Sequence, residues 1–525
     1  MPAGRPFYLT TPIFYVNDVP HIGHAYTEVA ADVLTRWHRQ AGDDTWLLTG
    51  TDEHGQKILR TATANGATPK EWTDKLVTEA WLPLLQTIDI ANDDFIRTTD
   101  ERHERRVKLF IEKLRAAGYI YEAEYEGLYC VGCEEFKPEA EIADGQGEYA
   151  GQKVCAIHGR PLELLQEKNY FFRMSEFQEK LLELYKQRPD FVQPESARNE
   201  VVAFVSQGLN DLSISRSTFD WGIPLPWDSS HVLYVWVDAL LNYATAIGYG
   251  EDDEQFERRW PAQHIVGKDI LRFHAVIWPA MLMAAGLEVP RGVFAHGWLL
   301  VGGEKMSKSK LTGIAPNEIT DTFGSDAFRY YFMRAISFGQ DGSFSWEDLA
   351  ARYQAELANG FGNLASRVIA MLTRYFGGEI PQPGKYEAAD LDVQVTVGNA
   401  VLAADAAIER FAIHDALAQV WRIVDALNGY ITEQEPWALA KDEAQRHRLA
   451  TVLYTAADGL RALAVLLSPV LTKATPKLWA ALGAESALGP LSGQKLREAG
   501  EWGVLPVGTR VGTLEPLFPR IEADA

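Results

Sequence analysis

The feature that most constrains the fold is an alternation of short apolar runs with amphipathic helical patterns, which occurs at two widely separated places in the chain. Strands that alternate with helices form a parallel sheet covered by helices, and such sheets bind ligands at the carboxyl ends of their strands. We therefore predict an α/β fold with a doubly wound, Rossmann-type parallel sheet that is built from two halves. The expected strands of the first half are 7–13, 45–49 and 94–98, and those of the second half are 232–237, 264–266 and 293–298.

The segment between the two halves carries a candidate metal site. All three cysteines of the chain lie there, in two short knuckles, Cys130-x-x-Cys133 and Cys155-x-x-His158. Three thiolates and one imidazole fit a tetrahedral Zn²⁺ with no open position, which is a structural rather than a catalytic site. The alternative is three reduced loop cysteines beside an unrelated histidine. We favour a structural zinc site because every cysteine in the chain is used.

The composition excludes some classes of protein. The 525 residues are 47% hydrophobic and 23% charged, as in globular proteins of several domains. A net charge of −22 argues against a non-specific nucleic-acid binder, and we expect no DNA partner, but an RNA held by local basic patches stays open. The N-terminus shows no signal-peptide pattern, and the longest apolar run, 232–249, is interrupted by Asp238 and Asn242. We expect a cytoplasmic protein without membrane partners.

A histidine-rich stretch follows the first expected strand and opens a helical pattern that extends to residue 37. His21 and His24 share one face of its first turn, where the helix dipole and backbone N–H groups favour phosphate. Gly23 lets a flat group such as a purine approach the backbone. Alone the pattern is weak, because paired histidines are more often surface or metal-binding groups. A lysine-rich loop at 305–309 supplies the second half of a nucleotide site.

These two stretches, His-Ile-Gly-His at 21–24 and Lys-Met-Ser-Lys-Ser at 305–309, resemble the signature motifs of the class I aminoacyl-tRNA synthetases letter for letter. The chain is further similar to the methionyl-tRNA synthetase family over essentially its whole length. The stretches that carry this similarity are Thr51-Asp52-Glu53-His54-Gly55, Gly267-Lys268-Asp269, Trp278-Pro279-Ala280, Asn363-Leu364-Ala365-Ser366-Arg367 and Glu435-Pro436-Trp437. The resemblance implies a methionine–tRNA ligase that activates L-methionine with ATP and transfers it to the 3′ end of initiator and elongator methionine tRNA.

The resemblance also assigns the signature residues. Charge builds on phosphate oxygens as a carboxylate attacks the α-phosphorus of ATP, so cations and positioning accelerate the reaction. Lys308 would stabilise the transferring phosphate with help from Lys305, and Mg²⁺ would bridge the pyrophosphate oxygens. The implied catalytic residues are His21, His24, Lys305 and Lys308, and the implied ATP-binding residues are His21, Gly23, His24, Gly267, Asp269 and Lys308.

The implied amino-acid pocket accepts an unbranched thioether and a free α-ammonium group. Asp52 and the backbone of Ile13 would hold the ammonium group, while aromatic rings suit the sulfur atom. Leu240 stands where many relatives have proline. We expect no editing domain, because the zinc module accounts for most of the insertion. The implied methionine-binding residues are Ile13, Tyr15, Asp52, Trp236, Ala239, Leu240, Tyr243, Ile270, Phe273, His274 and Trp278.

Beyond residue 312 the expected strands stop and long amphipathic helices begin. Within them Asn363, Arg367 and Trp437 match the anticodon-reading positions of the family, and stacking on an exposed tryptophan suits unpaired RNA bases. On spacing alone Arg367 would be an ordinary surface charge. The basic cluster at 102–108 is balanced by nearby acids, so we do not assign it to tRNA.

The expected organisation has five parts and one chain per molecule. Two alternatives remain: a catalytically silent RNA-binding relative, against which the intact signature residues argue, and a simple nucleotidyltransferase, which would need neither a zinc knuckle nor a helical domain. The parts are 1–118, the first half of the catalytic domain; 119–226, a connective insertion with the zinc knuckle; 227–312, the second half with the lysine loop; 313–350, a linking helical region; and 351–525, an all-α anticodon-binding domain with a C-terminal tail.

Overall fold

The computed structural model describes residues 4–137, 139–301, 304–305 and 314–521. Its centre is a six-stranded parallel sheet in the order β3-β2-β1-β14-β15-β9. The two halves of the sheet meet where β1 pairs with β14, and the strand order reverses there, which is where such sheets open a ligand crevice. The predicted two-part parallel sheet is therefore confirmed. The strands are β1 Pro6–Tyr15, β2 Asp44–Asp52, β3 Asp94–Arg97, β9 Val192–Gln193, β14 Gln263–Gly267 and β15 Gly292–His296.

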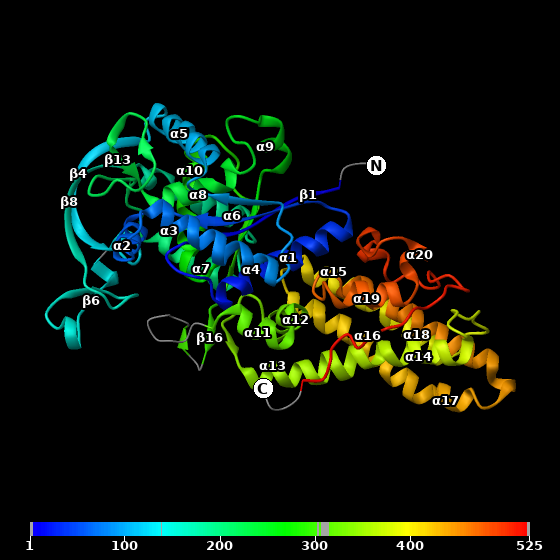
Figure 1. The fold of residues 1–525 in the computed structure, drawn as a ribbon. Helices are drawn as coiled ribbons and strands as arrows, with labels where there is room; N and C mark the ends of the chain where they lie inside the picture. Colours follow the sequence, from blue (N-terminus) through cyan, green and yellow to red (C-terminus); the bar gives the residue numbers. More distant parts are fainter. Residues whose placement is uncertain (1–3, 138, 302–303, 306–313, 522–525) are drawn as a thin grey trace.

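Alternate side chains of β1 enter two different cores, as the two-residue period of a strand requires. Phe7 and Leu9 pack with helix α1 and with the helical domain, whereas Tyr8 packs with helices on the opposite face of the sheet. Both faces of the sheet are thus covered (Figure 1). The helices of this domain are α1 Ile22–Ala41, α2 Gln56–Ala64, α3 Pro69–Leu76, α4 Leu82–Thr87, α5 Glu101–Ala116, α6 Gln178–Gln187, α7 Glu195–Ser206, α8 Val235–Thr245, α9 Asp253–Arg259 and α10 Trp278–Ala284.

One predicted strand was wrong. The apolar run 232–237 is not a strand of the parallel sheet, because β13 ends at Leu233 and α8 begins at Val235. β13, Asp228–Leu233, instead joins a small antiparallel sheet with β11, Ser215–Arg216, and β12, Pro224–Leu225. A continuous apolar run does not distinguish a buried strand from the start of a buried helix.

The segment between the halves projects as a curved two-stranded arm along the left edge of the protein (Figure 1). Its strands, β4 Ile120–Cys130 and β8 Glu163–Phe172, pair antiparallel from Ile120 with Phe172 to Tyr129 with Glu163. The two cysteine knuckles lie at its far end. The short strands around them are β5 Glu135–Phe136, β6 Ile142–Asp144 and β7 Lys153–Cys155, and β10 Leu212–Ser213 extends the other side of the sheet. The last part of the segment returns to the catalytic domain, where β9 joins the central sheet.

The chain beyond residue 312 is mostly helical, as predicted, and occupies the opposite end of the protein from the arm (Figure 1). The expectation that strands stop there was wrong at β18, Gly342–Phe344, which pairs parallel with β16, Leu299–Val301. The two expected short helices meet at Gly324, whose φ of +83° is a conformation that glycine adopts readily. The helices are α11 Pro316–Phe323, α12 Ser325–Ala335, α13 Trp346–Arg352, α14 Asn363–Phe376, α15 Ala388–Ile408, α16 Ile413–Gln434, α17 Pro436–Leu439, α18 Arg446–Leu467, α19 Ala474–Ala481 and α20 Ala484–Leu488. The strands beside the lysine loop are β16 Leu299–Val301, β17 Glu304–Lys305 and β18 Gly342–Phe344.

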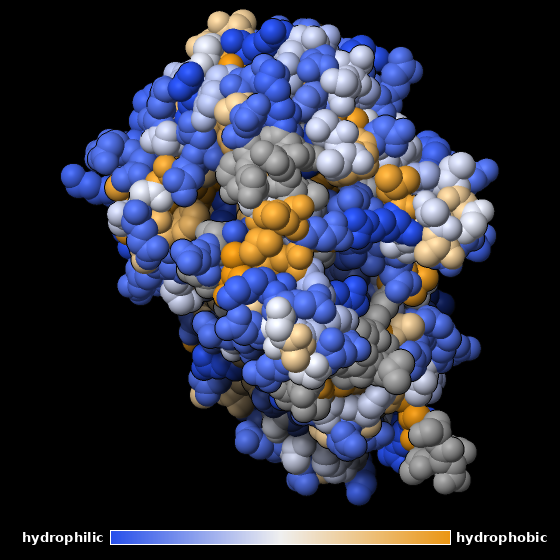
Figure 2. All heavy atoms as spheres, turned by 90° about the vertical axis from the view of Figure 1, so that its left-hand side faces the viewer, coloured by the Kyte–Doolittle hydropathy of each residue, from blue (hydrophilic) through white to orange (hydrophobic). Residues whose placement is uncertain are grey.

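Two helices in the described part of the chain are long and apolar enough to cross a membrane, judged by length and composition alone. The most apolar 18-residue window of Glu443–Leu467 is wholly buried, and that of Ala388–Ile408 is 39% buried. The face that carries the arm is mostly hydrophilic, with a smaller apolar area near its centre (Figure 2). Ile157 and Leu164 are exposed apolar side chains of the arm.

Candidate functional site

The first turn of α1 is capped by the two signature histidines. His21 Nδ1 accepts a hydrogen bond from the backbone N–H of Gly23 at 3.1 Å, and His24 Nδ1 accepts one from the N–H of His21 at 3.1 Å. Their rings stack with centroids 3.9 Å apart. Since a backbone N–H can only donate, both Nδ1 atoms are acceptors, and a neutral ring then carries its proton on Nε2. The two backbone N–H groups are occupied, so the imidazole Nε2–H groups become the donors that suit an oxyanion.

A cavity of about 350 Å³ opens beside these histidines at the carboxyl ends of β1, β2, β14 and β15. Ten of the predicted ATP-binding and methionine-binding residues line it, which brings these two sets of predictions to one place. These ten are Ile13, Tyr15, His21, Gly23, His24, Asp52, Trp236, Gly267, Asp269 and Ile270.

The other predicted methionine-binding residues lie in the packed layer behind the cavity wall. Phe273 stacks on Trp236 with parallel rings 3.9 Å apart. Behind them the Tyr243 hydroxyl contacts His274 Nε2 at 2.7 Å, and Trp278 is fully buried. Burial lowers the pKa of His274 to about 4, so this ring is neutral at pH 7. Ala239 and Leu240 are buried as well and do not line the cavity.

Asp52 is the buried anionic group at the end of β2 that faces the cavity. Its carboxyl is 5% exposed, and its Oδ1 has no hydrogen-bond partner among the described residues. Burial raises the pKa of Asp52 well above its ordinary value, and the nearby charge of Asp238 raises it further. A cationic ligand would supply the missing partner and stabilise the ionised form, so the arrangement suits an ammonium group.

Glu134, the residue after Cys133, links the metal knuckle to this cavity. Its Oε1 accepts hydrogen bonds from the Tyr15 hydroxyl at 3.1 Å and from the N–H of Lys57 at 2.6 Å, and its Oε2 accepts one from the Tyr129 hydroxyl at 2.7 Å. The Trp236 indole also donates to the carbonyl of Cys133 at 3.4 Å. The position of the knuckle therefore fixes two of the aromatic walls.

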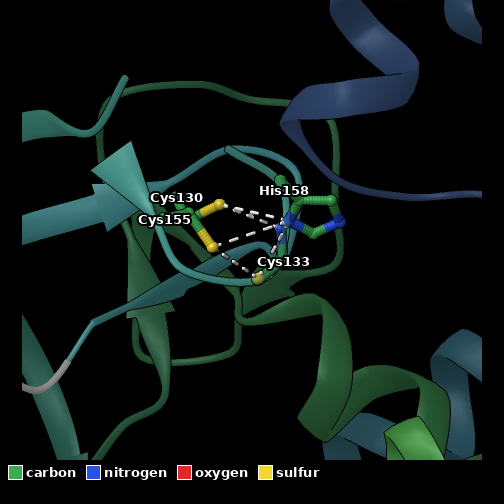
Figure 3. A group of neighbouring side chains, drawn as sticks. All are labelled: Cys130, Cys133, Cys155 and His158. Carbon is green, nitrogen blue, oxygen red and sulfur yellow. Dashed lines mark hydrogen bonds between the residues drawn. The ribbon is translucent and has the colours of Figure 1, made fainter. Parts of the chain in front are cut away.

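The four predicted metal ligands converge at the end of the arm (Figure 3). Their ligand atoms all lie within 4.8 Å of one another, with Cys133 Sγ 3.7 Å from Cys155 Sγ and His158 Nδ1 3.6 Å from Cys130 Sγ. Tetrahedral Zn²⁺ with bonds of about 2.3 Å to sulfur and 2.0–2.1 Å to nitrogen sets ligand separations of about 3.6–3.8 Å. Hydrogen bonding, chiefly with Cys133, lowers the pKa of Cys130 to about 3. The cluster fits a structural zinc site.

The lysine loop is only partly placed. Lys308 lies outside the described residues, and of Lys305 the structure describes the backbone, in β17. β17 pairs with β16, whose Leu299 lines the cavity, so the loop starts at the rim of the site.

The three predicted anticodon residues lie together at the far end of the helical domain. Asn363 and Arg367 lie one turn apart on α14, and the Arg367 guanidinium carbon lies 5.9 Å from the centroid of the Trp437 ring system. Trp437 stands at the start of α17 and is 38% exposed. The arginines of the basic helix α5 form ion pairs with acids elsewhere in the protein. Arg102 contacts Asp94, and both Arg105 and Arg106 contact Glu251.

Several residues of the cavity were not predicted. Lys57, Thr27, Glu134 and His296 line it. His296 ends β15, so the rule that ligands bind at the carboxyl ends of parallel strands could have found it. Thr27 holds the His296 ring through a 2.9 Å contact to Nε2. No sequence signal marks Glu134, because its role depends on how the arm folds back onto β1.

Comparison with known proteins agrees with this geometry. Residues 7–369 match the family described as tRNA synthetases class I (M), and residues 380–525 match the anticodon binding domain of methionyl tRNA ligase. The chain belongs to the methionyl-tRNA synthetase family. It is 61% identical to the methionine–tRNA ligase of Streptomyces coelicolor, over 99% of this chain and 97% of that protein. It is 47% identical to that of Caldanaerobacter subterraneus subsp. tengcongensis, over 99% of this chain and 80% of that protein.

A solved structure of the family has the same fold. The methionyl-tRNA synthetase of Mycobacterium tuberculosis in complex with methionyl-adenylate superimposes with a TM-score of 0.93 at 40% identity, covering 98% of this chain and 100% of that one. The apo form of that synthetase gives a TM-score of 0.86 at 38% identity, covering 99% of each chain. Membership of this family makes the chain a class I aminoacyl-tRNA synthetase, which is a ligase.

Proposed function

We propose that the chain joins L-methionine to methionine tRNA through a methionyl-adenylate, releasing pyrophosphate and then AMP. The observation that carries the proposal is the shared cavity at the carboxyl ends of the parallel strands. The imidazoles of His21 and His24 offer hydrogen-bond donors for phosphate there, and Asp52 Oδ1 is a buried carboxylate oxygen without a hydrogen-bond partner among the described residues. A ligand with an ammonium group at one end and a phosphate at the other matches both. Membership of the methionyl-tRNA synthetase family supports methionine as the amino acid.

Each residue then has a chemical task in the first step. Asp52 binds the ammonium group of methionine. This contact orients the carboxylate of methionine towards the α-phosphorus of ATP. His21 and His24 donate through Nε2–H to the ATP phosphates, while Gly267 and Asp269 hold the ribose side of the nucleotide. Lys308, assisted by Lys305, stabilises the negative charge that grows on the transferring phosphate. Mg²⁺ bound together with ATP would supply further positive charge.

The second step requires a tRNA that reaches from the cavity to the far end of the helical domain. Asn363, Arg367 and Trp437 supply a stacking surface and hydrogen-bond donors for anticodon bases there. That the enzyme acts as a cytoplasmic monomer, that it charges both initiator and elongator tRNA, and that its domains divide at residues 118, 226, 312 and 350 stay predictions. The zinc ligands are assigned a structural role.

Methionine-dependent ATP–pyrophosphate exchange tests the first step without tRNA. We expect exchange with methionine. Exchange with leucine, isoleucine or valine should be roughly 10- to 200-fold slower, because the pocket selects among apolar side chains by their fit. Lys308→Ala should reduce exchange by about 10²- to 10³-fold, and Lys310→Ala in the same loop is the matched control. No methionine-dependent exchange in the wild type would overturn the function, and near-normal exchange in Lys308→Ala would overturn the role of that lysine.

A further inference from the structure

Four buried carboxylates lie at or near the proposed ammonium-binding position at Asp52, and they differ in their hydrogen-bond partners. Glu53 accepts hydrogen bonds from the Arg97 guanidinium at 2.6 and 2.8 Å, and Glu134 is held by the three donors described above. Asp238, at the start of α8, is fully buried and accepts from two histidines. Asp52 alone has an oxygen without a donor among the described residues of this group. The negative charges of the neighbouring acids disfavour ionisation of Asp52, so their neutralisation helps Asp52 to hold an ammonium group as a carboxylate.

Asp238 owes its neutralisation to a histidine–carboxylate–histidine arrangement. His54 Nδ1 lies 2.7 Å from its Oδ2, and His103 Nε2 lies 2.7 Å from its Oδ1. The other nitrogen of His103 lies 2.7 Å from the Thr245 hydroxyl, which in turn donates to the carbonyl of Asn242 at 3.2 Å. His54 stands two residues beyond Asp52 at the same strand end, so it links the end of β2 that carries Asp52 to Asp238.

We propose that His54 is a positioning residue for the recognition of methionine: as an imidazolium it neutralises Asp238 and so leaves Asp52 as the anionic seat for the ammonium group. The inference rests on the proposed function, because it requires Asp52 to hold that group. His54 does not touch methionine in this arrangement. It acts through Asp238, and it also ties the end of β2 to α8, the helix that begins beside Trp236.

The electrostatics around the pair have the required signs. Burial lowers the pKa of His54, but the charge of Asp238 and its hydrogen bond raise it above the ordinary value, with Glu104 and Glu53 adding in the same direction. Burial raises the pKa of Asp238, and the His54 charge, the hydrogen bonds from both histidines and the His103 charge bring it below the ordinary value. Of the groups facing Asp52, the acids Asp238, Glu134 and Glu53 raise its pKa. A proton on His54 offsets the largest of these charges.

The sign of the pH dependence follows. Asp52 binds an ammonium group only when ionised, so methionine affinity falls as the pH drops through the pKa of Asp52. Removing the His54 charge takes away one of the two histidine partners that offset the charge of Asp238, and it raises the pKa of Asp52 further. A charge a few ångströms away in a protein interior shifts a pKa by roughly one to two units, so the acid limb of methionine binding should move up by that amount. Converting Asp238 to a neutral side chain removes the repulsion instead.

The experiment is a double-substitution cycle read as the pH dependence of the KM for methionine in ATP–pyrophosphate exchange. His54→Gln should raise the KM about 10-fold near the acid limb, with little change in kcat. Asp238→Asn should stay within about threefold of the wild type, and the double variant His54→Gln/Asp238→Asn should return towards the wild type. A purely structural role predicts the reverse, with the double variant worse than either single one.

A matched control and clear failures complete the design. His38→Gln removes the histidine of another buried histidine–aspartate contact, 2.8 Å from Asp43, near the opposite end of α1 and about 21 Å along the helix axis from His24. It should leave the pH profile unchanged. Two results would overturn the role of His54, provided that the wild type is active. One is a His54→Gln variant with the same KM profile as the wild type, and the other is a double variant that does not recover. Absence of methionine-dependent exchange in the wild type would instead overturn the proposed function.

Discussion

Replacing Arg329 by methionine should cost this protein several kcal/mol of stability. The Arg329 side chain is fully buried and donates to the Asp32 carboxylate at 2.6 Å, and also to the carbonyl groups of Ile88, Pro469 and Val470 at 3.0, 2.7 and 3.0 Å. Asp32 is fully buried too. Breaking a buried ion pair by removing one partner costs about 3–5 kcal/mol, because the other charge stays buried without compensation. We place the loss near 4 kcal/mol, since Arg36 still reaches Asp32 at 2.7 Å.

Thermal unfolding measures this loss. At about 2.1 cal/mol/K of unfolding entropy per residue, a chain of 525 residues changes its Tm by roughly 1 °C per kcal/mol, so Arg329→Met should lower the Tm by about 4 °C. Arg36→Met is the control, because Arg36 contacts the same Oδ2 of Asp32 but its side chain is 26% exposed. Because water still reaches the Arg36 side chain, its replacement should cost less than that of the fully buried Arg329. Equal losses in the two variants would refute the argument that burial sets the cost.

The remaining predictions concern RNA binding, pH and metal. Trp437→Ala should raise the KM for tRNA roughly 10- to 100-fold, since base stacking contributes about 1–3 kcal/mol, and should leave pyrophosphate exchange intact; equal loss of exchange would make Trp437 structural. Burial raises the pKa of Glu28 to about 8 despite its hydrogen bond from Thr49. The folded protein therefore keeps a proton that the unfolded chain loses, and stability falls as the pH rises from about 5 to 8, by up to roughly 1.4 kcal/mol per unit. Glu28→Gln should abolish this slope in Tm measurements, and an unchanged slope would contradict the assignment. Metal analysis should find one zinc per chain, and Cys155→Ser should lose it and lower the Tm; a metal-free wild type would refute the site.

The sequence allowed most elements to be predicted because their periods are strong. The parallel sheet followed from the alternation of strands and helices, and Gly324 marked the joint between α11 and α12. The failure at 232–237 has a local cause, since a run that is apolar at every position carries no period. β13 pairs antiparallel with β11 and β12 and ends at Leu233, and helix α8 begins two residues later at Val235.

Within the site, residues that belong to short motifs were predicted and residues that depend on long-range packing were not. The motif residues His21, His24 and Asp52 do line one cavity. Glu134 reaches Tyr15 across 119 positions of sequence, through an arm whose return path no local pattern specifies. Tyr243 was assigned to the pocket by resemblance, but it is buried against His264, His274 and Trp278 and does not line the cavity.

Helix α1 shows why such contacts escape a sequence pattern. A helical period assigns polar side chains to the solvent face, yet the polar residues Thr27, Glu28 and Asp32 of α1 are all buried. Each contacts a partner that the fold brings from elsewhere: Thr27 meets His296, Glu28 meets Thr49 through Oε1, and Asp32 meets Arg329, 297 positions away. The first of these contacts lies at the phosphate seat and the last at the joint with the helical domain. A buried polar group must be paired to be tolerated, so the pairing partners, rather than the helical period, determine how α1 carries the two histidines into the cavity.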